Sequence, residues 1–156
     1  MAFQLQVIRA SEFVCLDADE DLDFEATTKA LQLLAHACLK RGIDRALLDL
    51  RFTPVPSEPM FSRSQLAALV RVFWEAGCSP RHRLAVLYRS DPFGGIRTFA
   101  FIGRIYRRRV RAFNDFERAI YWLGDETEQC DEVQETAGMI RLNQSQDERK
   151  KTFGPR

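Results

Sequence analysis

The sequence predicts a single α/β domain with a mainly parallel five-stranded sheet, in the order β-β-α-β-α-β-α-β-α. Two short apolar segments joined by a tight turn open the chain and indicate an antiparallel hairpin. Strand-like and helix-like segments then alternate, and this alternation requires parallel neighbours and right-handed crossovers. Residues that favour helix caps also stand where the predicted helices begin and end.

The first two predicted strands form the hairpin. Apolar residues alternate with glutamines over residues 3–7, which is the period of a half-buried strand. Residues 12–16 form the second strand, after a turn at residues 10–11. An acidic run over residues 17–23 follows. Clustered carboxylates bind divalent cations in some proteins, but this run lacks the glycine and the final glutamate of a calcium loop. We therefore expect a solvated helix cap and no metal.

The next segments alternate between helix and strand. Apolar residues recur at steps of three and four over residues 24–41, and Gly42 suits the left-handed position that ends such a helix. Residues 44–50 are apolar enough for a central strand. Three prolines then lie within residues 51–61, and they exclude a helix from this loop.

The second helix has a complete start signal. Ser62 is expected at the N-cap with Gln65 as its capping-box partner, and Gly77 is expected to end the helix. Residues 84–88 form the fourth predicted strand.

The last elements are assigned in the same way. Asp91 is expected to cap the third helix, with Pro92 as its first residue, where a missing N–H costs nothing. Residues 110–113 form the fifth strand. A capping box of Asn114 and Glu117 is expected to start a short final helix.

The chain divides into an α/β domain over residues 1–124 and a polar tail over residues 125–156. The tail opens with acidic residues, ends with basic ones and holds few large apolar side chains. Such a segment buries too little surface to offset the entropy of ordering it, so we expect a disordered or loosely docked tail. A short helix over residues 126–136 is the alternative.

Composition argues against several classes of protein. The formal net charge is only +1, so nucleic acid is not an expected partner. No apolar stretch approaches the ~20 residues that span a bilayer, and no secretory signal opens the chain, so we expect a cytoplasmic protein. The cysteines and the two histidines show no metal-ligand spacing. We therefore expect no cofactor and buried free thiols at Cys15, Cys38, Cys78 and Cys130.

Two segments carry a resemblance to a known family. The strand LLDL at residues 47–50, the following loop and the helix capped by Ser62 resemble the strand–loop–helix signature of STAS domains, the SpoIIAA-like anti-sigma-factor antagonists. Residues 113–123, with a phenylalanine, an acidic turn, an alanine and Trp-Leu, are similar to the ending of the STAS-like subgroup of small bacterial proteins. The resemblance spans residues 1–124 and implies a non-catalytic regulatory module that binds a protein partner.

The resemblance also implies a site of phosphorylation. In the family, a serine or threonine at the start of the second helix is often phosphorylated by a partner kinase, usually just after an aspartate. The matching serines here are Ser62 and Ser64, without the preceding aspartate. Ser62 has a sufficient role as N-cap, although a phosphate at a helix N-terminus is well tolerated. Both interpretations stay open.

Ligands of parallel α/β sheets bind beyond the carboxyl ends of the strands. We expect the proline-rich loop and residues 90–95 to meet there. A protein partner, or alternatively a small apolar ligand, would contact this surface; in the other interpretation its aromatic side chains simply close the core. The candidate residues are Phe52, Met60, Phe61, Asp91, Phe93, Gly94 and Gly95.

A dense basic patch is predicted near the fifth strand. Arginines suit phosphate recognition, but they equally suit the C-terminus of a helix, and we expect a solvated face that complements the helix dipole. The patch comprises Arg104, Arg107, Arg108, Arg109 and Arg111, with Arg97 upstream.

Three functions follow from the sequence. The first is the regulatory interaction module, and the second is a carrier of a small apolar molecule. The third is an enzyme that uses Asp49, Asp91 and Ser62 near the strand ends, and it has the least support because no activated nucleophile or base stands out. The sequence identifies neither the partner nor the oligomeric state.

Overall fold

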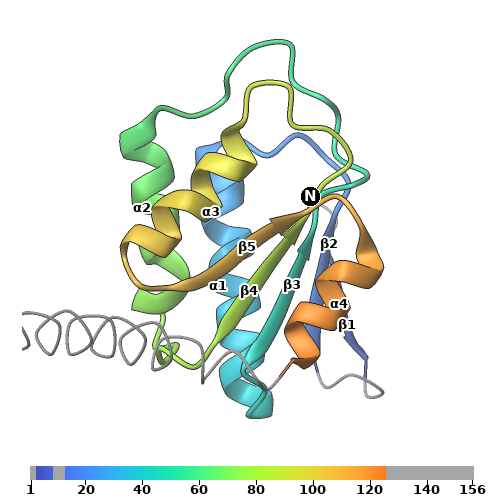
Figure 1. The fold of residues 1–156 in the computed structure, drawn as a ribbon, viewed down its shortest axis with the longest axis vertical. Coiled ribbons are helices and arrows are strands. Elements are labelled where there is room, and N and C mark those ends of the chain that lie inside the picture. Colours follow the sequence, from blue (N-terminus) through green and yellow to red (C-terminus); the bar gives the residue numbers. More distant parts are fainter. Residues whose placement is uncertain (1–2, 9–12, 126–156) are drawn as a thin grey trace, which may run out of the picture. The chain divides into compact units, whose positions relative to one another are not determined.

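The computed structural model describes residues 3–8 and 13–125. Their order of strands and helices is the predicted one, and the α/β class is confirmed (Figure 1). The strands are β1 (Phe3–Ile8), β2 (Phe13–Ala18), β3 (Arg45–Asp49), β4 (Arg83–Leu87) and β5 (Arg109–Phe113). The helices are α1 (Phe24–Arg41), α2 (Arg63–Glu75), α3 (Gly95–Ile105) and α4 (Phe116–Gly124).

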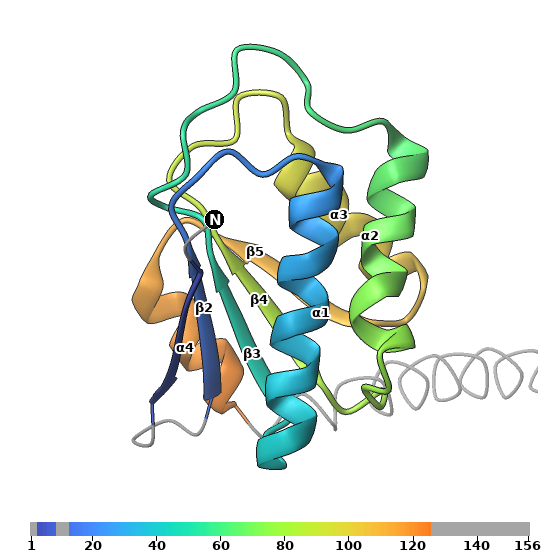
Figure 2. The ribbon, with the colours of Figure 1, turned by 180° about the vertical axis from the view of Figure 1, so that it is seen from behind.

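The sheet adds each new strand beside the previous one, in the order β1-β2-β3-β4-β5. β1 pairs antiparallel with β2, and the other pairs are parallel, with Asp17 of β2 beside Asp49 of β3. When parallel strands are added in one direction, right-handed crossovers place every connecting helix on the same face. Figure 2 shows this arrangement, with α1, α2 and α3 covering one face and α4 the other.

Each face of the sheet has its own core. Side chains alternate along a strand, so Leu48 packs beneath α1–α3 while its neighbour Leu47 packs beneath α4. The three-helix side forms the larger cluster, and α4 contributes Ala119, Trp122 and Leu123 to the smaller one. The loops that follow β3 and β4 lead to α2 and α3, so they lie on the same side of the sheet as the larger core.

Several local predictions are confirmed and some element boundaries shift. Gly42 takes the left-handed conformation that ends α1, with φ of 65°. β2 ends two residues later than the predicted strand over residues 12–16, so it includes Asp17 and Ala18, the first residues of the acidic run. Asp23 caps α1, because its side chain accepts a hydrogen bond of 2.7 Å from the N–H of Ala26.

The predicted capping box at the start of α4 is wrong. The helix begins at Phe116, one residue later than predicted, and Asp115 rather than Asn114 precedes it. The Asp115 Oδ1 accepts a hydrogen bond of 2.9 Å from the N–H of Arg118. Aspartate and asparagine cap equally well, so the cap preference alone does not fix the register of this helix.

Some predictions lie outside the described residues. These are the turn at residues 10–11, the tail over residues 126–156 and the free thiol of Cys130. Of the helices that the structure describes, none has both the length and the apolar composition needed to cross a lipid bilayer.

Candidate functional site: a cavity at the carboxyl ends of the strands

A cavity of about 330 Å³ opens beyond the carboxyl ends of β3 and β4. Its wall contains residues of α1, α2 and α3 and of the loops that follow β2, β3 and β4. Figures 1 and 2 show these loops together at one end of the sheet. Pockets for small molecules have volumes of roughly 300–1,000 Å³ and mostly apolar walls. The buried apolar residues of the wall are Leu22, Leu31, Leu48, Leu66, Leu69, Val86 and Phe99.

The two segments predicted to meet at this end of the sheet do meet. Two residues of the predicted surface, Phe52 and Gly94, lie outside the cavity wall. The wall does contain Met60, Phe61, Asp91, Phe93 and Gly95. Their part in binding stays a prediction.

Most of the predicted aromatic and apolar side chains do not close the core. Phe52 is 68% exposed, Phe93 47% and Met60 42%. Phe61, by contrast, is half-buried and packs against the larger core. The loops above the sheet therefore present large apolar side chains to solvent.

Asp91 holds the loop that carries Phe93, in a different way from the one predicted. α3 begins at Gly95 rather than Pro92, and the residue at its N-cap is Gly94, with φ of 68°. The Asp91 carboxylate reaches past this turn and accepts hydrogen bonds from the N–H groups of Ile96, at 3.3 Å, and Arg97, at 3.1 Å. The carboxylate thus caps the helix from outside it and fixes the loop over the cavity.

Ser62 has the predicted N-cap geometry at the start of α2. Its Oγ accepts a hydrogen bond of 3.2 Å from the N–H of Gln65, and the Gln65 Oε1 accepts one of 2.9 Å from the N–H of Ser62. The hydroxyl of Ser64 lies 3.0 Å from that of Ser62, and both serines are exposed. Phe61 and Arg63, on either side of Ser62, line the cavity.

We expect Ser62→Ala to lower the free energy of unfolding by about 1 kcal/mol, because the N–H of Gln65 loses the Ser62 Oγ that caps it. Ser64→Ala is the matched control, since its hydroxyl does not cap the helix, and it should stay within ~0.5 kcal/mol of the wild type. Urea denaturation measures both. Equal stability of the two variants would show that the cap does not stabilise α2.

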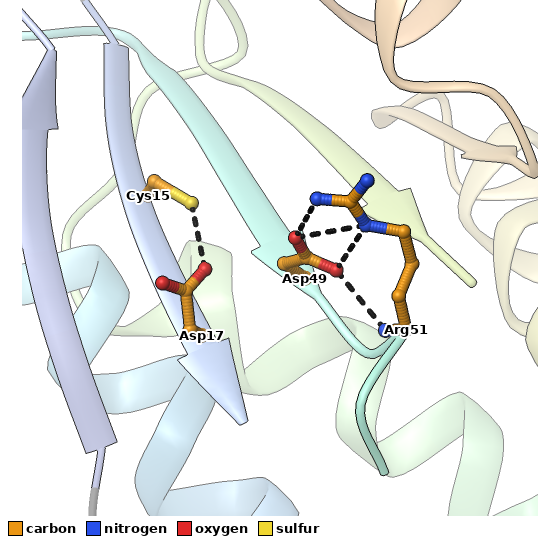
Figure 3. Close-up of polar contacts among 4 residues, drawn as sticks. All are labelled: Cys15, Asp17, Asp49 and Arg51. Atoms are coloured by element: carbon orange, nitrogen blue, oxygen red, sulfur yellow. Dashed lines mark hydrogen bonds and ion pairs between the residues drawn. The ribbon is translucent and has the colours of Figure 1, made fainter. Parts of the chain in front are cut away.

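Asp49 lies on the opposite face of the sheet from the cavity. Its neighbours Leu48 and Leu50 line the cavity, whereas its own buried carboxylate is paired with Arg51 (Figure 3). The Arg51 Nε and Nη2 donate to it at 3.0 Å and 2.6 Å, and the Arg51 N–H donates at 3.0 Å. These hydrogen bonds raise the pKa of the Arg51 guanidinium.

The three residues considered for catalysis are not brought into one site. Only Asp91 belongs to the cavity wall, while Ser62 caps α2 outside it and Asp49 faces α4. Beside Asp49, the thiol of Cys15 donates a hydrogen bond of 3.2 Å to Asp17 (Figure 3). Burial, followed by this hydrogen bond, raises the pKa of Cys15 and so opposes its use as a nucleophile.

The arginines of the predicted basic patch surround β5, which is an edge strand, and two of them contact aromatic rings of different helices. The Arg108 guanidinium lies 5.7 Å from the ring centre of Trp74, in the α1–α3 layer. The Arg111 guanidinium lies 5.5 Å from that of Trp122, in α4. Arg111 lies in β5, whereas Arg108 lies just before this strand. Arg104 and Arg107 are exposed, and Arg109 is half-buried.

Three cysteines are free and buried, as predicted for them. Burial raises the pKa of Cys38 to about 12 and that of Cys78 to about 11, so both thiols stay protonated at neutral pH. In a Cys130→Ser variant, we expect a thiol-disulfide reagent to label the folded protein very slowly up to pH 10, because the thiolate is the reactive form. All three remaining thiols should react at once in denaturant. Rapid labelling of the folded variant would contradict this burial.

Of the three comparisons with known proteins, only the one with solved structures gives matches. No protein-family model matches the chain, and no curated protein matches its sequence. Among the solved structures that match is the anti-sigma factor antagonist SpoIIAA in its unphosphorylated form. The identity is 15% and the TM-score 0.40, over 85% of this chain and 98% of the other. A protein of the family that the sequence resembles is thus among the matches.

Proposed function

We propose that residues 1–124 form a STAS-type, non-catalytic regulatory module that binds a protein partner through the loops above the cavity. The observation that carries this proposal is the exposure of Phe52, Val55, Met60 and Phe93 on two neighbouring loops. Single exposed apolar residues are ordinary, but a group of them at one end of a domain is typical of an interaction surface.

The loops are well suited to binding because they are held in place before a partner arrives. Prolines stiffen the β3–α2 loop, and the Arg51–Asp49 ion pair anchors its start. The Asp91 carboxylate anchors the β4–α3 loop through its hydrogen bonds to α3. A surface that is already ordered loses little conformational entropy on association, which favours affinity.

A pull-down from native lysate tests this surface. The bait is the wild type, a Phe52→Ser/Phe93→Ser variant or, as control, Tyr121→Ser, which removes an aromatic side chain that is 77% exposed on α4. We expect one stable partner to be captured by the wild type and the control but not by the loop variant. A partner captured equally by all three would bind elsewhere and contradict the proposed surface.

Phosphorylation of Ser62 or Ser64 would regulate this surface. Both hydroxyls are exposed and adjoin Phe61 and Arg63 at the cavity. A phosphate adds a charge of about −1.5 to −2 there, which disfavours an apolar partner while the N-terminus of α2 tolerates it. Mass spectrometry of the protein from its native cells should find the phosphate. Its absence under all growth conditions would remove the switch but leave the binding module.

A second function, the binding of a small apolar molecule, is favoured by the cavity itself. The cavity is large enough for such a ligand, and its leucine-rich wall would desolvate an apolar group. Native mass spectrometry of the purified protein should then show a co-purified lipid or metabolite. A protein that is free of ligand and binds none of a panel of apolar compounds would contradict this function.

A further inference from the structure

Two arginines give the apolar cavity a charged mouth. Arg63, the first residue of α2, and Arg89, just after β4, both belong to the cavity wall and are exposed. Within residues 3–8 and 13–125, neither guanidinium has a hydrogen-bond or ion-pair partner. Arg97, an exposed arginine in the first turn of α3, is instead paired with the carboxylate of Asp91. These two therefore remain available to a ligand at the mouth.

The acidic groups of the wall offset only part of this positive charge. Asp91 is already neutralised by Arg97, whose Nε lies 3.3 Å from its Oδ2, and by two backbone N–H groups. Asp21, at the exposed end of the wall, is the other carboxylate that lines the cavity. α2 and α3 also begin at this end of the sheet, and the partial positive charges of their first turns add to those of the arginines.

We propose that the cavity binds an amphiphile with one anionic head group, such as a free medium-chain carboxylate. The apolar chain would lie against Leu31, Leu66 and Leu69, and the carboxylate between the guanidinium groups of Arg63 and Arg89. Arginine pairs well with carboxylates because its planar donors match their two oxygens. This inference rests on the second proposed function and names the class of its ligand.

A series of head groups on one chain length tests the charge. Decanoate, decanol and decyltrimethylammonium are titrated below their micellar concentrations into the full chain by calorimetry. We expect decanoate to bind ~tenfold more tightly than decanol, since two charge-assisted contacts are added, and the cation to bind more weakly than either. Changes in the NMR signals of the methyl groups of Leu31, Leu66, Leu69 and Val86 should place the chain inside the cavity.

Substitutions at the mouth assign the effect to the two arginines. Arg63→Gln/Arg89→Gln should weaken decanoate ~tenfold and leave decanol unchanged, because only the head group loses its partners. Arg81→Gln is the control, since Arg81 is an exposed arginine before the amino end of β4, away from the cavity wall. Its affinities should equal those of the wild type.

The outcomes distinguish a failure of this inference from a failure of the second proposed function, the binding of a small apolar molecule. Equal affinities for decanoate and decanol, with methyl changes in the cavity, would overturn the anionic class while leaving an apolar-ligand site. Tight binding of decanoate with methyl changes elsewhere would overturn the inference as well. Binding of none of the three compounds at millimolar concentration would overturn the small-molecule function itself. The partner capture described above is independent of all three results.

Discussion

Replacing Gly103 with alanine is expected to destabilise the domain by about 2 kcal/mol. Gly103 is buried in α3 where this helix crosses β5, and an added methyl group would overlap the Cγ1 of Val110. Overpacking of this kind costs ~1–3 kcal/mol or more, and the stiff χ1 of valine limits relaxation. The gain of helix propensity from glycine to alanine, about 1 kcal/mol, offsets only part of it. Thermal and urea denaturation measure the net loss.

Two further variants show whether the close contact causes this loss. Gly124→Ala is the matched control, because nothing lies within 4 Å of the methyl group it adds at the end of α4. Its stability should stay within ~0.5 kcal/mol of the wild type. In Gly103→Ala/Val110→Ala, the new methyl group takes space that valine vacates, so the double variant should lose at least ~1 kcal/mol less than the sum of the single losses. Additive losses would place the cause elsewhere.

Local sequence signals predicted the elements of this fold because helix caps and turns are set by interactions between residues that are close in the sequence. The capping box at Ser62 and the left-handed Gly42 depend on a few neighbouring residues, and the structure has both. The start of α3 was missed for the opposite reason. Asp91 caps the helix by reaching past a turn to Ile96 and Arg97, and no short pattern places a carboxylate so far from the helix it caps.

The cavity was predicted only in part, because its wall depends on the order of the strands. Sequence placed the β3–α2 and β4–α3 loops at one end of a parallel sheet, and this accounts for Met60, Phe61 and Phe93. The contributions of Leu31 from α1 and of Arg89 could be predicted only from the strand order, which places α1, α2 and α3 on one face of the sheet. Arg63 and Arg89 carry no sequence signal, because single exposed arginines are common on any surface.

The same dependence explains why Asp49, considered for catalysis near the strand ends, lies apart from the cavity. A strand residue at the carboxyl end points to one face or the other, and a shift of one residue reverses the choice. Leu48 and Leu50 face the cavity, so Asp49 faces α4, where it pairs with Arg51. Its position in the LLDL segment therefore serves the fold, by fixing the start of the β3–α2 loop.

We expect Asp49→Ala to lower the free energy of unfolding by about 2 kcal/mol, because several hydrogen-bond donors of Arg51 lose their acceptor at once. The carboxylate is buried and accepts from the N–H, Nε and Nη2 of Arg51. Removing one partner of a buried ion pair costs ~3–5 kcal/mol, but the Arg51 side chain is 37% exposed, so water replaces part of the loss. Asp44→Ala should change stability by less than ~0.5 kcal/mol, since Asp44 is 57% exposed and lies 3.9 Å from Arg45.

The loss of the Asp49 carboxylate should also affect the proposed partner surface, because Phe52 belongs to it. The Arg51 guanidinium lies 5.6 Å from the ring centre of Phe52 and 5.3 Å from that of Phe116, so it links the β3–α2 loop to α4. Without its carboxylate this link loosens, and the amide protons of residues 51–53 should exchange faster in Asp49→Ala than in Asp44→Ala. Asp49→Asn keeps the shape and one acceptor, so it should fall between the wild type and alanine in both measurements. If the loop exchanges at the wild-type rate in Asp49→Ala while stability falls, the ion pair stabilises only the carboxyl end of β3, and the prolines hold Phe52 in place.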